Sequence, residues 1–127
     1  IRIRIYHPTD TKAKLELKQK QGENQHKLSL GITREQAQEM IAGNYDCLLE
    51  EGSELAENIY GIMHKEQYRP SALIQYKRRA FAVPINNIRI TFDSHIETSE
   101  GNFDLFSEHP GIFYPADTQS FVVLEVK

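Results

Sequence analysis

The stretch Ile1-Arg2-Ile3-Arg4-Ile5 alternates strictly between an apolar and a basic residue. Successive side chains of a β-strand point to opposite faces, so this pattern puts the isoleucines on one face and both arginines on the other. Residues 14–20 repeat the pattern with leucines set against Lys14, Glu16, Lys18 and Lys20, and residues 25–30 repeat it after a turn at 21–24. We therefore expect a three-stranded meander with one apolar face and one basic face.

Similar alternation marks the second half of the chain. A long strand is expected over 71–83, where Pro84 closes it, and a second over Ile88 to Asp93, with Arg89, Thr91 and Asp93 on its polar side. Residues 98–119 contain several Gly and Pro residues and predict loops, and residues 121–127 predict a final strand.

Two amphipathic helices are expected between these groups of strands. Thr33 followed by Gln36 is a capping-box signature, and Gly43-Asn44 should end the helix that it starts. A second helix should begin at Ser53 and finish before Pro70. Helices combined with antiparallel strands predict the α+β class, and 127 residues allow a single domain over 1–127.

The net charge of −3 hides blocks of opposite sign. Residues 1–30 and 67–92 carry +4 and +5, whereas residues 31–66 and 93–127 carry −6 each. The acidic block over the helices is typical of a solvated helical face. The lone Cys47 fits a reducing compartment, so a cytoplasmic location is expected. No apolar run is long enough to cross a bilayer, so any membrane association would come through parts outside this chain, which starts at Ile1 and is interpreted as a fragment.

The polar face of several predicted strands is mostly Lys or Arg. An antiparallel sheet with one face in water needs only polar residues there, whatever their sign, and that is the simpler explanation for any one strand. Like charges opposite one another are destabilising, so a whole face of bases indicates that anionic oxygens bind among them. Aromatic residues rarely share this face, which argues against nucleic acid and favours phosphate, and no glycine-rich phosphate loop is present.

The sequence also resembles the VTC domain, the polyphosphate polymerase module of the vacuolar transporter chaperone, which occurs in bacterial proteins too. The resemblance covers essentially the whole chain. It is carried by these pieces in order: Arg2-Ile3-Arg4-Ile5-Tyr6, Leu15-Glu16-Leu17-Lys18, Lys27-Leu28-Ser29, Tyr76-Lys77-Arg78, Val83-Pro84, Asn87-Ile88-Arg89-Ile90-Thr91-Phe92-Asp93, Phe103-Asp104-Leu105-Phe106 and Leu124-Glu125-Val126-Lys127.

The resemblance implies a triphosphate tunnel fold, in which an antiparallel β-barrel has a charged lumen and helices packed outside. It implies binding of ATP, triphosphate or polyphosphate, and transfer of the terminal phosphoryl group of ATP to polyphosphate with Mn²⁺ or Mg²⁺. Glu125 corresponds to the metal ligand of the family, and the neighbouring Lys77 and Arg79 leave the position of Arg78 uncertain by one residue. The residues that correspond to the phosphate-binding set are Arg2, Arg4, Lys18, Lys27, Arg78, Arg89 and Lys127.

Several alternatives stay open at this point. A metal-dependent triphosphatase of the same fold, or a non-enzymatic module that binds polyphosphate or inositol phosphate, would use similar residues. Glu16 and Asp93 are candidates for further metal ligands or for charge partners of the bases. The family's first strand and its last lysine-bearing elements have no counterpart here, so we expect a domain that is incomplete at both ends and a chain whose own catalysis is uncertain.

Overall fold

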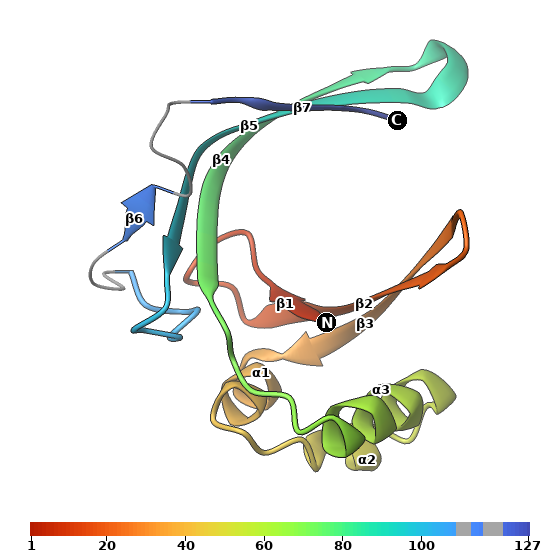
Figure 1. Ribbon diagram of the computed structural model, residues 1–127, viewed down its shortest axis with the longest axis vertical. Coiled ribbons are helices and arrows are strands. Elements are labelled where there is room, and N and C mark those ends of the chain that lie inside the picture. The colour runs from red at the N-terminus through yellow and green to blue at the C-terminus, as the bar shows by residue number, and fades with distance from the viewer. Residues whose placement is uncertain (109–112, 116–120) are drawn as a thin grey trace. The chain divides into compact units, whose positions relative to one another are not determined.

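The computed structural model describes residues 1–108, 113–115 and 121–127, which divide into two compact units (Figure 1). Unit 1 holds residues 1–70 and the described residues from Asp104 to Glu108, and unit 2 holds residues 71–103 with 113–115 and 121–127. Both contain antiparallel sheet, and unit 1 adds helices, which confirms the predicted α+β class. That 1–127 forms one domain stays a prediction.

The sheet of unit 1 is the predicted meander. Strands β1 (Arg2–Arg4), β2 (Lys12–Gln21) and β3 (Asn24–Thr33) pair antiparallel in the order β1-β2-β3. Gln21 lies opposite Asn24, so only two residues turn the β2–β3 hairpin, and Gly22 takes the first position with φ of 60°. A positive φ at that position is the reason that tight hairpins favour glycine there.

Three helices follow in unit 1: α1 (Arg34–Ile41), α2 (Cys47–Glu51) and α3 (Glu54–Lys65). Thr33 and Gln36 form the predicted capping box, and the Ser53 hydroxyl accepts from the Ala56 amide at the start of α3. The α2 turn was not predicted, because it has only five residues and too few apolar repeats to show helical periodicity.

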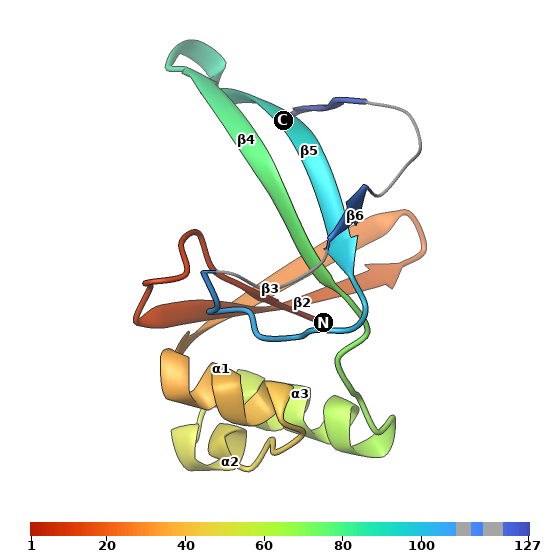
Figure 2. The same cartoon turned by 90° about the vertical axis from the view of Figure 1, so that its left-hand side faces the viewer.

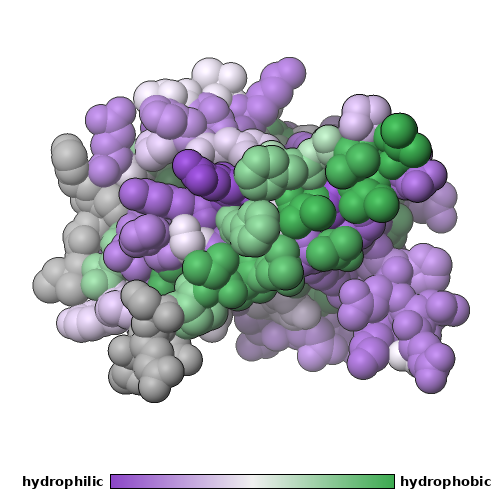
Figure 3. Space-filling model, turned by 90° about the horizontal axis from the view of Figure 1, so that it is seen from above, coloured by the Kyte–Doolittle hydropathy of each residue, from purple (hydrophilic) through white to green (hydrophobic). Residues whose placement is uncertain are grey.

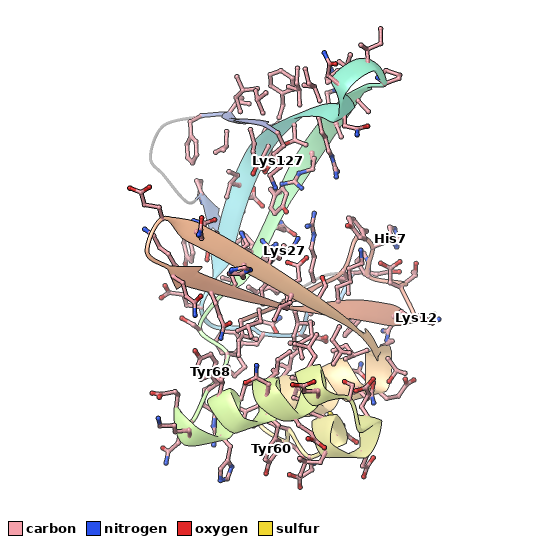
Figure 4. All side chains as sticks on the ribbon, turned by 90° about the vertical axis from the view of Figure 1, so that its right-hand side faces the viewer. His7, Lys12, Lys27, Tyr60, Tyr68 and Lys127 are labelled. Carbon is pink, nitrogen blue, oxygen red and sulfur yellow. The ribbon has the colours of Figure 1, made fainter. Side chains whose placement is uncertain are left out.

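The apolar side of the unit 1 sheet packs on these helices. Leu15 of β2, Met40 of α1, Leu48 of α2 and Ile59 of α3 are at most 2% exposed. In Figure 2 the helices lie along one side of β2 and β3, and Figure 4 shows Lys27 on the other side of that sheet from Tyr60 of α3. The predicted separation of an apolar face from a basic face is therefore confirmed in unit 1.

Unit 2 is built around strand β5 (Ile88–Ser99). The long β4 (Leu73–Val83) pairs along one edge of β5, and β6 (Tyr114–Pro115) and β7 (Val123–Val126) pair with it on the other edge. A short 3₁₀ turn, η1 (Ile85–Asn87), joins β4 to β5 in the gap between the two strands predicted from the sequence.

Strand β5 runs six residues beyond the Asp93 end that alternation predicted. Between the pairs Gln75–Glu97 and Lys77–Ser94, β5 has one residue more than β4, and His95 takes a φ of 53°. Such a bulge shifts the side-chain alternation by one residue, so the pattern changes there although the strand continues.

The apolar face of the unit 2 sheet is largely exposed. Figure 3 shows hydrophobic side chains gathered in one area over the strands of this unit. Phe81 and Phe92 pack edge to face with ring centroids 6.0 Å apart, yet they are 53% and 37% exposed. No α-helix belongs to the described part of unit 2, so the expected cover of helices applies to unit 1 only.

A closed barrel does not form among the described strands. The β1–β3 sheet and the β4–β7 sheet are separate, and closure requires every edge strand to have a hydrogen-bonded neighbour on each side. The triphosphate tunnel is thus not confirmed. Within residues 1–108, 113–115 and 121–127, no helix is long and apolar enough to cross a bilayer.

Candidate functional site

The first basic face is the side of the unit 1 sheet that points away from the helices. Antiparallel register puts Arg2 of β1 opposite Glu16 of β2, and Glu16 opposite Ser29 of β3. Alternation then places bases on every side of this row. The first basic face consists of Glu16 and the surrounding bases Arg2, Arg4, Lys14, Lys18 and Lys27.

Glu16 is the centre of this face and is only 2% exposed. The Arg2 Nε donates to Glu16 Oε2 at 2.8 Å, and Arg2 Nη2 donates to the same oxygen. On the other carboxylate oxygen, Lys27 Nζ lies 3.1 Å away and Arg4 Nη1 lies 3.9 Å away. One buried carboxylate therefore holds bases from two neighbouring strands.

Burial opposes ionisation of Glu16, but hydrogen bonds from Arg2 and Lys27 outweigh it and lower the pKa of this carboxyl below its ordinary value. The Glu16 carboxyl is consequently an anion at neutral pH. Its contacts are those of a charge partner of the bases, one of the two roles considered from the sequence. A metal role for Glu16 stays a hypothesis.

Cationic groups remain available on the first basic face. Lys18 lies directly opposite Lys27, an arrangement that is unfavourable without an anion nearby. Lys18 makes no ion pair with any carboxylate in the part of the chain that the structure describes. A hollow of about 120 Å³ is lined by Ile1, Arg2, Glu16 and Lys18, so a small ligand can reach the edge of this face.

The second basic face belongs to unit 2 and is defined by three rows across β4, β5 and β7. Register gives the rows Arg78–Asp93–Val123, Ala80–Thr91–Glu125 and Ala82–Arg89–Lys127. The last row is closed by backbone hydrogen bonds of 2.8 and 2.9 Å between Arg89 and Lys127. Figure 4 labels Lys127 at the end of β7.

Arg78 forms a bidentate salt bridge with Asp93. Its Nε donates to Asp93 Oδ1 at 2.6 Å and its Nη2 to Oδ2 at 2.7 Å. These hydrogen bonds raise the pKa of Arg78 above its ordinary value, so the guanidinium stays charged. Tyr76 supports it from the same face, with Arg78 Cζ 5.3 Å from the ring centroid.

The β4–β5 register shows which of the three bases at 77–79 lies on the same face of the sheet as Arg89. Arg78 shares its face with Arg89, whereas Lys77 and Arg79 lie on the opposite side of β4. Arg89 is exposed and makes no ion pair with a carboxylate among the residues described. Its guanidinium fork can therefore receive two oxygens of one phosphate.

Glu125 was predicted to bind metal. It is 47% exposed, and its Oε1 lies 3.2 Å from Lys127 Nζ. No group of three or more metal-ligating side chains occurs in the described part of the chain. A single carboxylate still fits Mg²⁺ or a similar hard cation, because such ions are commonly held by one or two carboxylates together with phosphate oxygens and water.

Both basic faces are built on alternating strands, and these strands follow the chain order expected from the sequence. The family model of the VTC domain matches residues 1–127. The chain belongs to the VTC domain family. Membership of this family indicates a function related to polyphosphate. Searches of curated proteins and of solved structures find no match.

The structure groups the predicted site residues into two sets. Arg2, Arg4, Lys18 and Lys27 share the first basic face. Arg78, Arg89, Glu125 and Lys127 share the second. Their roles in binding phosphate and metal stay predictions. Sequence reasoning missed the burial of Glu16, and the only signal was an acid in the middle of an otherwise basic alternating strand.

Proposed function

We propose that this VTC-family chain binds the phosphate groups of ATP, triphosphate or polyphosphate, and serves transfer of the terminal phosphoryl group of ATP to polyphosphate with Mn²⁺ or Mg²⁺. The observation that carries this proposal is the first basic face, where five bases surround a single buried carboxylate. Such an excess of positive charge on one side of a sheet is unfavourable unless anions bind there.

Phosphoryl transfer requires little from the protein except that it positions the phosphate groups and neutralises their charge. In phosphoryl transfer the charge spreads over the phosphate oxygens, and guanidinium forks bind these oxygens two at a time. Arg2 and Arg4 of the first basic face and Arg89 of the second would bind phosphate oxygens in this way. A phosphate oxygen of the acceptor chain would attack, so no side chain needs to act as a nucleophile.

Glu125 would hold the divalent cation at the second basic face. The cation would neutralise part of the charge on the phosphates, and phosphate oxygens and water would complete its coordination. Release of Lys127 from Glu125 would free both groups, the carboxylate for the cation and the ammonium for a phosphate. The exposure of both side chains, 47% and 70%, supports this exchange.

The closed triphosphate tunnel remains part of the proposal. Its support is that each sheet carries its predicted phosphate-binding bases on one face and a group of apolar residues on the other, the alternation that a small barrel with a polar lumen requires. A cytoplasmic location belongs to the same proposal, and the unpaired Cys47 is compatible with it.

Phosphate without a nucleobase platform is favoured over nucleic acid. Phe81 and Phe92 lie on the side of the unit 2 sheet opposite Arg89, so they offer no stacking surface beside the bases. Tyr76 shares the face of Arg89, but its ring already contacts Arg78, whose Cζ lies 5.3 Å from the ring centroid. On the first face, one aromatic ring, that of Tyr6, is held by Arg4, whose Cζ lies 4.9 Å from the ring centroid. Binding of single-stranded nucleic acid normally uses several free rings in succession.

Calorimetric titration of the chain with tripolyphosphate at low salt tests the binding step. Arg2→Ala should weaken binding about tenfold, because a charge-assisted phosphate contact is worth roughly 1.5 kcal/mol or more. Lys65→Ala, which removes one charge from the last turn of α3, is the matched control and should change affinity little. Unchanged affinity in both Arg2→Ala and Arg4→Ala would contradict the proposal.

Incubation with ATP and Mn²⁺ tests the reaction. Growth of long phosphate chains identifies a polymerase, and release of free phosphate alone identifies a triphosphatase. Binding without turnover, unaffected by Glu125→Gln or by removal of metal, identifies a non-enzymatic module for polyphosphate or inositol phosphate. The family connection with polyphosphate supports the polymerase proposal, and the assay decides among the three.

A further inference from the structure

Thr91 occupies the centre of the second basic face. Across the sheet it lies between Ala80 of β4 and Glu125 of β7, and along β5 it lies between Arg89 and Asp93. Diagonal neighbours in antiparallel sheets are within reach of long side chains, and Arg78 and Lys127 are the diagonal neighbours of Thr91 on this face. An anion held by Arg89 and these two bases together would therefore lie close to Thr91.

Thr91 is a buried polar residue with an unused hydroxyl. It is 4% exposed, and its Oγ1 has no hydrogen-bond partner in the described part of the chain. Buried hydroxyl groups are nearly always hydrogen-bonded, since an unmet donor or acceptor is costly. Valine would fill the same volume in a strand without that cost.

The side chains that surround Thr91 explain how a ligand can reach it. On the β4 side the neighbour of Thr91 is Ala80, whose side chain is short, and on the β7 side Glu125 and Lys127 are exposed. Rotamer changes of exposed side chains occur in nanoseconds or less, so these groups can turn aside as a ligand arrives.

We propose that the Thr91 hydroxyl donates a hydrogen bond to an oxygen of a phosphate group held by Arg89, Arg78 and Lys127. This proposal rests on the phosphate-binding function proposed above and adds one ligand-contacting residue to it. The chemical class of the ligand is a linear phosphate chain. The hydroxyl is short and rigid, so it would fix the position of one phosphate, whereas the arginine and lysine side chains supply charge.

Titration of the full chain with tripolyphosphate tests this role in matched variants. Thr91→Val replaces the hydroxyl with a methyl group of similar size and should weaken binding about tenfold, the loss that accompanies one hydrogen bond to a charged group. Thr98→Val makes the same change on the same strand at a position opposite Ile74 and Tyr114, and should bind like the unsubstituted chain.

A thermal melt of each variant separates binding from folding. Thr91→Val should melt at or slightly above the temperature of the unsubstituted chain, because it removes an unpaired buried hydroxyl. Thr91→Ser keeps the hydroxyl and should retain most of the affinity even if loss of the methyl group lowers the melting temperature.

The outcomes distinguish this proposal from the proposed function. Equal affinity of Thr91→Val and the unsubstituted chain overturns the role of Thr91 and leaves phosphate binding intact. A loss in Thr91→Ser as large as in Thr91→Val also overturns it, because the methyl group would then be responsible. No binding of tripolyphosphate by the unsubstituted chain overturns both proposals.

Discussion

Replacement of Glu16 by Gln is the sharpest test of how the first basic face is held together. The substitution keeps the size of the side chain but removes the negative charge that Arg2, Arg4 and Lys27 share. Removal of one member of a fully buried ion pair costs about 3–5 kcal/mol. Arg2 and Lys27 are each 47% exposed, so solvent screens part of the interaction and we expect a loss of about 2 kcal/mol.

A thermal melt followed by circular dichroism measures this loss. For a chain of 127 residues, 1 kcal/mol corresponds to roughly 3–5 °C, so Glu16→Gln should melt about 6–10 °C lower at low salt. Glu23→Gln makes the same chemical change at an exposed position of the β2–β3 turn and should shift the melt by less than about 2 °C.

Added anion should reverse part of the loss. If phosphate takes the place of the Glu16 charge among the bases, tripolyphosphate should raise the melting temperature of Glu16→Gln more than that of the unsubstituted chain. A melt of Glu16→Gln that matches the unsubstituted chain would refute the energetic reasoning. A clear loss that tripolyphosphate leaves unchanged would refute the view that this face receives anions.

Further predictions concern the other contacts. The pKa of Glu16 is lowered in the folded chain, so its stabilisation is present above its ordinary value of 4.5 and lost as the pH falls below it; in acid melts the difference between Glu16→Gln and the unsubstituted chain should therefore shrink. Asp93→Asn should lower stability by about 1 kcal/mol in urea unfolding without weakening tripolyphosphate binding, since it releases the Arg78 guanidinium; a weaker complex would show that Asp93 itself contributes to the site. Thr33→Ala removes the side-chain cap of α1, which is one of the two hydrogen bonds of its capping box, so urea unfolding should report a loss of about 1 kcal/mol, whereas an unchanged midpoint would mean that packing alone defines this helix end. Glu125→Gln should weaken binding of Mn²⁺, so ATP turnover should no longer respond to the low Mn²⁺ concentrations to which the unsubstituted chain responds; full retention of that response would assign the cation to other ligands.

Local signals were sufficient for most of the secondary structure. Alternation over Ile1-Arg2-Ile3-Arg4-Ile5 and over 14–30 predicted the meander, because a strand with one buried face must repeat every two residues. The helix caps at Thr33 and Ser53 could also be predicted, because the capping oxygen accepts a hydrogen bond from an amide only three residues further along the chain. The same locality concealed the bulge near His95, where one added residue changes the alternation without ending the strand.

The candidate site was only partly readable for a related reason. Sequence identified the bases, and alternation assigned them to faces, but in the run of bases at 77–79 it could not decide which one faces Arg89. That choice depends on the β4–β5 register, which pairs Arg78 with Asp93. Cross-strand register is set by a turn and by contacts between residues far apart in the chain, so the residue types alone do not specify it.

By itself, then, the sequence determined the α+β class, the basic and apolar faces of the strands, and membership of the VTC domain family. Only the tertiary structure decided that Glu16 is buried beneath Arg2, Arg4 and Lys27, and that the unpaired hydroxyl of Thr91 is surrounded by the second set of bases. Alternation is a local property of one strand, whereas burial and charge pairing arise when strands meet, and the chemistry of both faces depends on that meeting.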